Sequence, residues 1–163
     1  VLINNAGYQA SRATIEEIDS AEFESIFRTN VFAMFYLCRA ALPKMKEGAS
    51  IINVASIQAY DPSPNLLPYA ATKGAIVTFS KALAKMAIER GVRVNVVAPG
   101  PVWTPLIVAT MPPEKHQNFG KESSMQRPAQ PVELSPAFVF LASKDASYIH
   151  GEVLGVTGGR PMP

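Results

Sequence analysis

The sequence has few charged residues, a single cysteine and no long hydrophobic run, and each shortage excludes a class of protein. Charged residues make up 17% of the chain and the net charge is +2, with no cluster of lysine and arginine to attract nucleic acid. The single cysteine, Cys38, cannot form a disulfide within the chain, and the apolar residues at 31–42 around it predict a buried thiol.

No apolar stretch is long enough to suggest a membrane protein. The stretches are short and interrupted by Asn, Gly, Pro or charged residues, so neither a signal peptide nor a membrane span is predicted. Together with the lone cysteine, this composition favours a reducing compartment. We therefore expect a cytoplasmic protein.

What the sequence does contain is enough apolar material for one core. Of its 163 residues, 48% are hydrophobic, and this length is typical of a single domain. Strand patterns at 1–3, 50–55, 92–98 and 153–156 alternate with helical patterns at 22–45, 69–90 and 133–142. A polar loop is expected at 57–68 and a long irregular stretch at 102–130. This alternation predicts an α/β fold, a three-layer doubly wound parallel sheet of the Rossmann type, over residues 1–163.

Three turn-forming segments directly follow predicted strands. Asn5-Ala6-Gly7 follows the first strand, Ser56 the second and Pro99-Gly100-Pro101 the third. Ligands of a parallel sheet bind at the carboxyl ends of its strands, so the three segments should open onto the same edge. The sequence therefore predicts a binding site at that edge.

Tyr69 and Lys73 are four residues apart at the start of the long helix, and so lie on one helix face. The ammonium can favour the phenolate, which predicts a pKa of Tyr69 lowered from its ordinary value of about 10. A tyrosine of this kind is a general acid and base for a carbonyl or alcohol oxygen. Ser56 could hold the same oxygen. These three residues point to hydride chemistry.

Several further motifs occur in a fixed order along essentially the whole chain. They are Asn4-Asn5-Ala6-Gly7, Asn30, Ser56, Tyr69-x-x-x-Lys73, the segment 93–101 and Thr157-Gly158-Gly159. Taken together, they resemble the short-chain dehydrogenase/reductase family. The segments 57–60 and 99–106 are similar to a bacterial subgroup of NADP-dependent aldehyde or general oxidoreductases, some of them glucose or stress-response dehydrogenases. The resemblance implies hydride transfer between a nicotinamide cofactor and an aldehyde, a ketone or a sugar.

The resemblance implies catalytic roles for four residues. Tyr69 would exchange a proton with the substrate oxygen, and Lys73 would lower the pKa of Tyr69 and bind the nicotinamide ribose. Ser56 would polarise and orient the substrate oxygen. Asn30 would interrupt its helix and help to hold a water molecule that links Lys73 to solvent.

The resemblance also implies a cofactor and an oligomer. The cofactor would be NADP or NAD, with NADP preferred, and no metal is expected. The helices at 22–45 and 69–90 resemble those that pair between subunits, which implies a homodimer or homotetramer. The implied cofactor-binding residues are Asn5, Ala6, Gly7, Tyr69, Lys73, Pro99, Gly100, Val102 and Thr104.

The irregular stretch after Thr104 resembles the mobile lid that covers the substrate in this family. Its large apolar residues could touch the substrate or only pack against one another. They are Trp103, Met111, Phe119 and Met125. His116 and His150 are far apart in the sequence, without cysteines or carboxylates at ligand spacing, so no metal site is predicted.

The sequence also departs from the family pattern. It has no G-x-x-x-G-x-G or G-x-G-x-x-G turn to bind the diphosphate, and no counterpart of the strand that reads the ribose 2′ position. It lacks an initiator Met and opens inside a strand, so we expect that an N-terminal portion of the domain is missing. The domain predicted at 1–163 is thus a partial one.

These departures leave an alternative open. A non-catalytic fragment or pseudoenzyme could contribute only an oligomerisation surface. A sugar-nucleotide epimerase or dehydratase also uses Tyr-x-x-x-Lys, but such enzymes carry a larger C-terminal substrate domain. A serine hydrolase built on Ser56 and Asp61 would need a G-x-S-x-G turn, which the sequence lacks.

Overall fold

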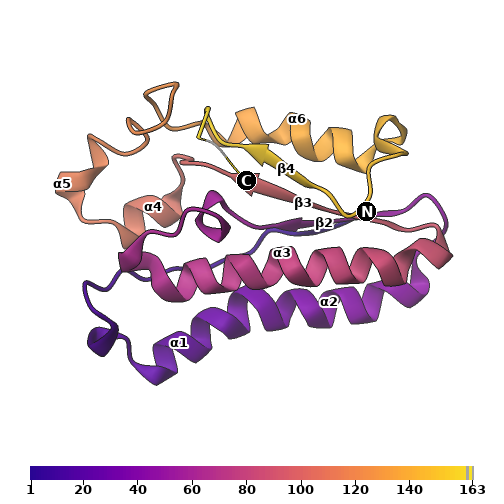
Figure 1. The fold of residues 1–163 in the computed structure, drawn as a ribbon, viewed down its shortest axis with the longest axis horizontal. Coiled ribbons are helices and arrows are strands. Elements are labelled where there is room, and N and C mark those ends of the chain that lie inside the picture. Colours follow the sequence, from indigo (N-terminus) through magenta and orange to yellow (C-terminus); the bar gives the residue numbers. More distant parts are fainter. Residues whose placement is uncertain (161, 163) are drawn as a thin grey trace.

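The computed structural model of the chain describes residues 1–160 and 162 and contains a four-stranded parallel sheet (Figure 1). The strands follow the chain order, β1-β2-β3-β4. All four carboxyl ends therefore lie at one edge of the sheet. The strands are β1 (Leu2–Asn4), β2 (Ser50–Val54), β3 (Arg93–Pro99) and β4 (Val153–Val156).

Helices follow each of the first three strands and cover the sheet. The α-helices are α1 (Ser20–Phe27), α2 (Ala33–Ala41), α3 (Leu67–Ala87), α4 (Pro105–Thr110), α5 (Pro113–His116) and α6 (Pro131–Ala142). Short 3-10 turns are η1 (Ile15–Glu17), η3 (Leu42–Lys44), η4 (Ile57–Ala59), η5 (Pro64–Leu66), η6 (Ile88–Arg90) and η7 (Lys144–Ala146), and η2 (Arg28–Phe32) is a π-turn.

The sheet is buried between two helical layers. On one face α2 and α3 pack against Ile51, Val94 and Val96, and on the other face α6 packs Leu141 against Ile52 and Val97. Figure 1 shows α6 above the sheet and α2 and α3 below it. Successive strand residues point to opposite faces, so both faces of β2 and β3 need apolar side chains. The predicted three-layer α/β architecture is confirmed.

A polar chain runs through the core between the sheet and α3. Asn4 Nδ2 donates to Asn53 Oδ1 over 2.7 Å, and Asn53 Nδ2 donates to Ser80 Oγ over 2.8 Å. Asn4 Nδ2 also lies 3.3 Å from the Sγ of Cys38. Burial raises the pKa of the Cys38 thiol to about 11. The thiol is thus a core group, as its apolar sequence neighbours predict.

Most element ends agree with the sequence prediction within two residues, and three differences concern the site. The single helix expected at 22–45 is divided by the π-turn Arg28–Phe32 into α1 and α2. The stretch 102–130, expected to be irregular, contains α4 and α5. The helix expected at 69–90 begins as α3 two residues earlier, because Pro68 suits the first turn of a helix. No helix among residues 1–160 and 162 is long and apolar enough to cross a membrane.

Candidate active site

The site lies where β2 ends and α3 begins. Ser56 follows β2 and is buried, and its Oγ accepts a hydrogen bond from the backbone nitrogen of Gln58 over 3.2 Å. Tyr69 lies in the first turn of α3, and Lys73 follows one turn later on the same side. Lys73 Nζ donates to the carbonyl oxygen of Val54 over 2.8 Å and lies 5.2 Å from the centre of the Tyr69 ring. Three predicted catalytic side chains thus meet at one place.

Burial dominates the electrostatics of this pair. Burial raises the pKa of Tyr69, and a hydrogen bond with Ser56 partly opposes this by favouring the phenolate. Burial also lowers the pKa of Lys73 to about 8. The sequence predicts a lowered pKa for Tyr69, and that prediction is wrong for the chain without a ligand. Lys73 is directed to a backbone carbonyl, and desolvation of both side chains outweighs the attraction of the ammonium for a phenolate.

Asn30 lies in the π-turn between α1 and α2, which is the helix interruption that the family resemblance implies. Its side chain holds the backbone of Tyr8 at both ends: Oδ1 accepts from Tyr8 N over 2.8 Å and Nδ2 donates to Tyr8 O over 2.9 Å. Nδ2 also donates to Thr72 Oγ1 over 3.0 Å, and Thr72 Oγ1 donates to Tyr69 O over 2.6 Å. Asn30 therefore joins the loop after β1 to the first turns of α3.

A cavity of about 780 Å³ opens at this edge of the sheet. Asn30 is not in its wall but lies behind Gly7, where an added Cβ would come 3.7 Å from Asn30 Oδ1. The cavity brings together the other predicted site residues from the three strand ends and from α3. They are Asn5, Ala6, Gly7, Ser56, Tyr69, Lys73, Pro99, Gly100, Val102 and Thr104.

The cavity wall suits the nicotinamide and ribose end of a dinucleotide. At Gly100 the chain passes so close to the residue after β4 that a Cβ would lie 2.6 Å from the carbonyl oxygen of Thr157. A glycine at this position lets the wall formed by Pro99, Gly100 and Pro101 lie against the turn after β4. A Cβ on Gly7 would lie 3.8 Å from Lys73 Nζ, so a strong donor lies beside that segment, as ribose hydroxyls require. The residues present therefore fit this part of the cofactor.

The stretch 102–130 covers the cavity. Met111 and Phe119 line the cavity wall. Trp103 packs edge-on against His116, with ring centres 5.6 Å apart, and lies 6.0 Å from the Phe119 ring. Met125 is 65% exposed. Of the four apolar residues that the sequence left undecided, Met111 and Phe119 are thus the ones placed to meet a substrate.

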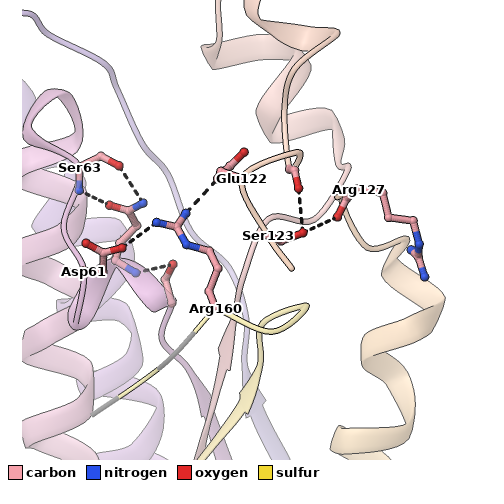
Figure 2. A network of polar contacts seen from close by, with 9 residues as sticks. Asp61, Ser63, Glu122, Ser123, Arg127 and Arg160 are labelled. Carbon is pink, nitrogen blue, oxygen red and sulfur yellow. Dashed lines mark hydrogen bonds and ion pairs between the residues drawn. The ribbon is translucent and has the colours of Figure 1, made fainter. Parts of the chain in front are cut away.

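Arg160, to which the sequence motifs assign no role, also lines the cavity. Arg160 Nη2 donates to Asp61 Oδ2 over 2.6 Å, and its Nη1 lies 3.6 Å from Glu122 Oε1 in the covering stretch (Figure 2). Both Arg160 and Glu122 line the cavity. Asp61 therefore pairs with an arginine 99 residues away, and no local sequence signal could reveal that contact.

The turn that ends the Thr157-Gly158-Gly159 motif holds the covering stretch in place. Met125 N donates to Gly158 O over 3.1 Å, and Ser124 Oγ donates to Gly159 O over 3.0 Å. Gly159 has a φ of +89°, and a Cβ there would lie 2.6 Å from the Cβ of Ser124. A glycine is required at this position both for the backbone conformation and for the close approach.

The two histidines contact backbone groups. His150 Nδ1 accepts from Val94 N over 3.3 Å, and its Nε2 lies 2.9 Å from Ala84 O. His116 Nε2 lies 3.0 Å from Met111 O. In the described part of the chain, no three His, Cys, Asp or Glu side chains are grouped as metal ligands.

Known proteins are similar to this chain in both sequence and fold. A family model described as enoyl-(acyl carrier protein) reductase matches residues 1–160. The NADPH-dependent aldehyde reductase 1 of Arabidopsis thaliana is 54% identical over 160 residues, which cover 98% of this chain and 56% of that protein. The chain thus spans little more than half the length of this relative.

Two solved structures from Brucella melitensis superimpose on almost the whole chain. A 3-ketoacyl-(acyl-carrier-protein) reductase in complex with NADH is 36% identical with a TM-score of 0.88, covering 98% of this chain and 66% of that one. A short-chain dehydrogenase/reductase described as glucose/ribitol dehydrogenase is 32% identical with a TM-score of 0.90, covering 99% of this chain and 65% of that one. Sequence, fold and the arrangement of the site agree, and the chain belongs to the short-chain dehydrogenase/reductase family.

Proposed function

We propose that this chain forms the catalytic part of an oxidoreductase that transfers a hydride between a nicotinamide cofactor and a carbonyl or alcohol substrate. The observation that carries the proposal is the meeting of Ser56, Tyr69 and Lys73 at one cavity. When bound, the nicotinamide ring gives or takes the hydride. The chain itself has to position the substrate oxygen and move a proton.

Each of the three side chains has one task in the proposal. Tyr69 gives its hydroxyl proton to the substrate oxygen during reduction and accepts a proton during oxidation. Ser56, whose hydroxyl lowers the pKa of Tyr69 against the larger effect of burial, orients the same oxygen. Lys73 has a pKa of about 8, so it can take up and release a proton near neutral pH and pass it towards Tyr69. Asn30 is a positioning residue, because its amide holds the loop after β1 against α3.

For the cofactor we propose NADP or NAD, with NADP preferred. A relative that is 54% identical is named as NADPH-dependent, while a structural neighbour was solved with NADH. Gly7, Gly100 and Lys73 would hold the nicotinamide and ribose end. Asn5, Ala6, Pro99, Val102 and Thr104 complete the wall.

The substrate class we propose is an aldehyde, a ketone or a sugar. The cavity wall is apolar at Leu106, Ile107 and Met111, whereas Glu122 and Arg160 add charged groups to it. A small carbonyl compound with an apolar or hydroxylated tail suits such a mixed lining. The names aldehyde reductase and glucose/ribitol dehydrogenase among the similar proteins support this class.

A homodimer or homotetramer is part of the proposal. On and beside α2, four large apolar side chains are between 40% and 52% exposed. A patch of this kind is typical of a protein interface. The four are Phe32, Phe35, Tyr36 and Leu37. A cytoplasmic location stays a prediction.

The second candidate function is the non-catalytic fragment. The chain spans 56% of the length of a curated relative, and it has no glycine-rich diphosphate turn. In that case the apolar patch on α2 would be the functional surface, and the cavity would bind no cofactor. Cofactor binding separates the two candidates.

The test is turnover of a small aldehyde with NADPH by variants of the site. Tyr69→Phe removes the proton donor and should lower the rate at least about 100-fold, and Ser56→Ala should lower it by a similar factor. Tyr60→Phe is the matched control, because Tyr60 packs against the same core but does not line the cavity. Equal rates for the Tyr69→Phe and Tyr60→Phe variants would overturn the proposed role of Tyr69.

A further inference from the structure

Gln9 is a buried polar residue in the cavity wall to which neither the motifs nor the proposed chemistry assign a role. It follows β1 in the loop that begins with Asn5, and only 6% of its surface is exposed. Its Nε2 donates to Thr110 Oγ1, the last residue of α4, over 2.8 Å. The Thr110 hydroxyl in turn donates to Leu106 O over 2.6 Å. The hydroxyl proton of Thr110 is therefore used in a hydrogen bond within α4, and its oxygen accepts the hydrogen bond from Gln9.

This contact holds α4 over the cavity. Within residues 1–160 and 162, it is the one hydrogen bond that joins α4 to another part of the fold outside the covering stretch. The helix is short, and Val108 on its outer side is 53% exposed, so little else fixes its position. Leu106 and Ile107 of the same helix line the cavity. Their distance from a bound substrate therefore depends on where α4 is held.

The other end of the contact is rigid. Tyr8, next to Gln9, has both backbone groups bound by the Asn30 amide. Asn30 also bonds Thr72, whose hydroxyl bonds the carbonyl oxygen of Tyr69. Hydrogen bonds, together with the peptide bond between Tyr8 and Gln9, thus connect α4 to the first turn of α3. This connection fixes α4 relative to the residue proposed to donate the proton.

We propose that Gln9 is a positioning residue, which holds α4 closed over the cavity and so sets the affinity for substrate without taking part in proton transfer. The inference rests on the proposed function for its effect on substrate. The placement of α4 itself does not depend on that function. Loss of the contact should loosen α4, raise the KM and leave kcat and its pH profile nearly unchanged.

The decisive measurement is amide hydrogen exchange of the full chain at residues 106–110 of α4, because it needs neither cofactor nor turnover. Gln9→Met keeps the length of the side chain and removes the donor, and Thr110→Val keeps the shape of the threonine and removes the acceptor. Gln9→Met should speed exchange about fivefold to tenfold, the effect of one lost hydrogen bond. Thr110→Val also removes the bond from the hydroxyl to Leu106 O, so it should speed exchange at least as much. The double variant should exchange no faster than Thr110→Val alone, because that change already removes the bond to Gln9.

Thr110→Ser is the matched control, since it keeps the hydroxyl and should exchange like the original chain. Exchange at β3 identifies any variant that loosens the whole fold, and the other single variant, compared with Thr110→Ser, then carries the test. Unchanged exchange at 106–110, or effects that add in the double variant, would overturn the role of Gln9. An inactive original chain would overturn the proposed function but would leave the exchange result to decide about Gln9.

Discussion

The buried ammonium of Lys73 should make the fold less stable at neutral pH. Its pKa is about 8 in the folded chain, against an ordinary value of 10.5. The unfolded chain therefore binds this proton more tightly, and the free energy of unfolding rises with pH between these two values. The difference corresponds to a destabilisation of about 3 kcal/mol that is fully present near pH 7 and is lost progressively above pH 8.

Lys73→Met should remove this penalty. The variant also leaves the Val54 carbonyl without its donor, which costs about 1–2 kcal/mol. At pH 7 the variant should therefore be more stable than the original chain by about 1–2 kcal/mol. By about pH 9.5 that advantage should shrink by about 2 kcal/mol, so the two chains become equal or the order reverses. At pH 7 the Lys73→Met variant should thus be more stable than the original chain, although it loses the proposed activity.

Urea unfolding followed by circular dichroism at several pH values measures both quantities. The control is Lys81→Met on the exposed side of the same helix, which removes an ammonium without burying or exposing a core group. A Lys73→Met variant that is less stable at neutral pH, with a difference independent of pH, would refute the desolvation of Lys73 and the proton role that rests on it.

Three further substitutions test the packing around the site. Gly120→Ala should disorder the covering stretch, because Gly120 has a φ of +83° and a Cβ there would lie 2.4 Å from Pro128 N. The fluorescence emission of the single tryptophan should then shift to that of a solvent-exposed tryptophan. Asn53→Leu should lower the free energy of unfolding by about 2–3 kcal/mol in urea, since both hydrogen-bond partners of this buried amide lose a bond. Gly100→Ala should weaken NADPH binding at least about tenfold by fluorescence titration, because the new methyl group pushes the wall away from Thr157.

The sheet and the edge that carries the site are predictable because their signals are local. The segment 93–99 is β-branched and almost uncharged, and such a strand is stable only where helices cover both faces. Ser56 lies two residues after β2 and Gly100-Pro101 directly after β3, so the parallel topology alone brings them to one edge. The structure confirms this part of the prediction.

The helix break at Asn30 is a different case. Apolar periodicity predicts one helix over 22–45, because a single π-turn shifts the pattern by only one residue. Only the resemblance to a family implies the break. The structure adds its physical basis, which is that the turn aims the Asn30 amide at the backbone of Tyr8.

The contacts that complete the site depend on the path of the whole chain. Arg160 meets Asp61 across 99 residues and Gln9 meets Thr110 across 101, and neither pair has a motif or a period. The direction in which the pKa of Tyr69 is shifted could not be predicted from the sequence for a similar reason. The direction of this pKa shift depends on how deeply Tyr69 and Lys73 are buried, and not on their spacing along the helix.

The central claim is that the cavity beside Tyr69 binds a nicotinamide cofactor for proton-coupled hydride transfer. The most direct test is to titrate NADPH, then NADH, into the 163-residue chain while following nicotinamide fluorescence, and to add a small aldehyde to the complex. We predict micromolar binding that favours NADPH, followed by oxidation of the cofactor that the Tyr69→Phe variant abolishes without losing the binding. Absence of binding, or oxidation that persists in Tyr69→Phe, would contradict the account.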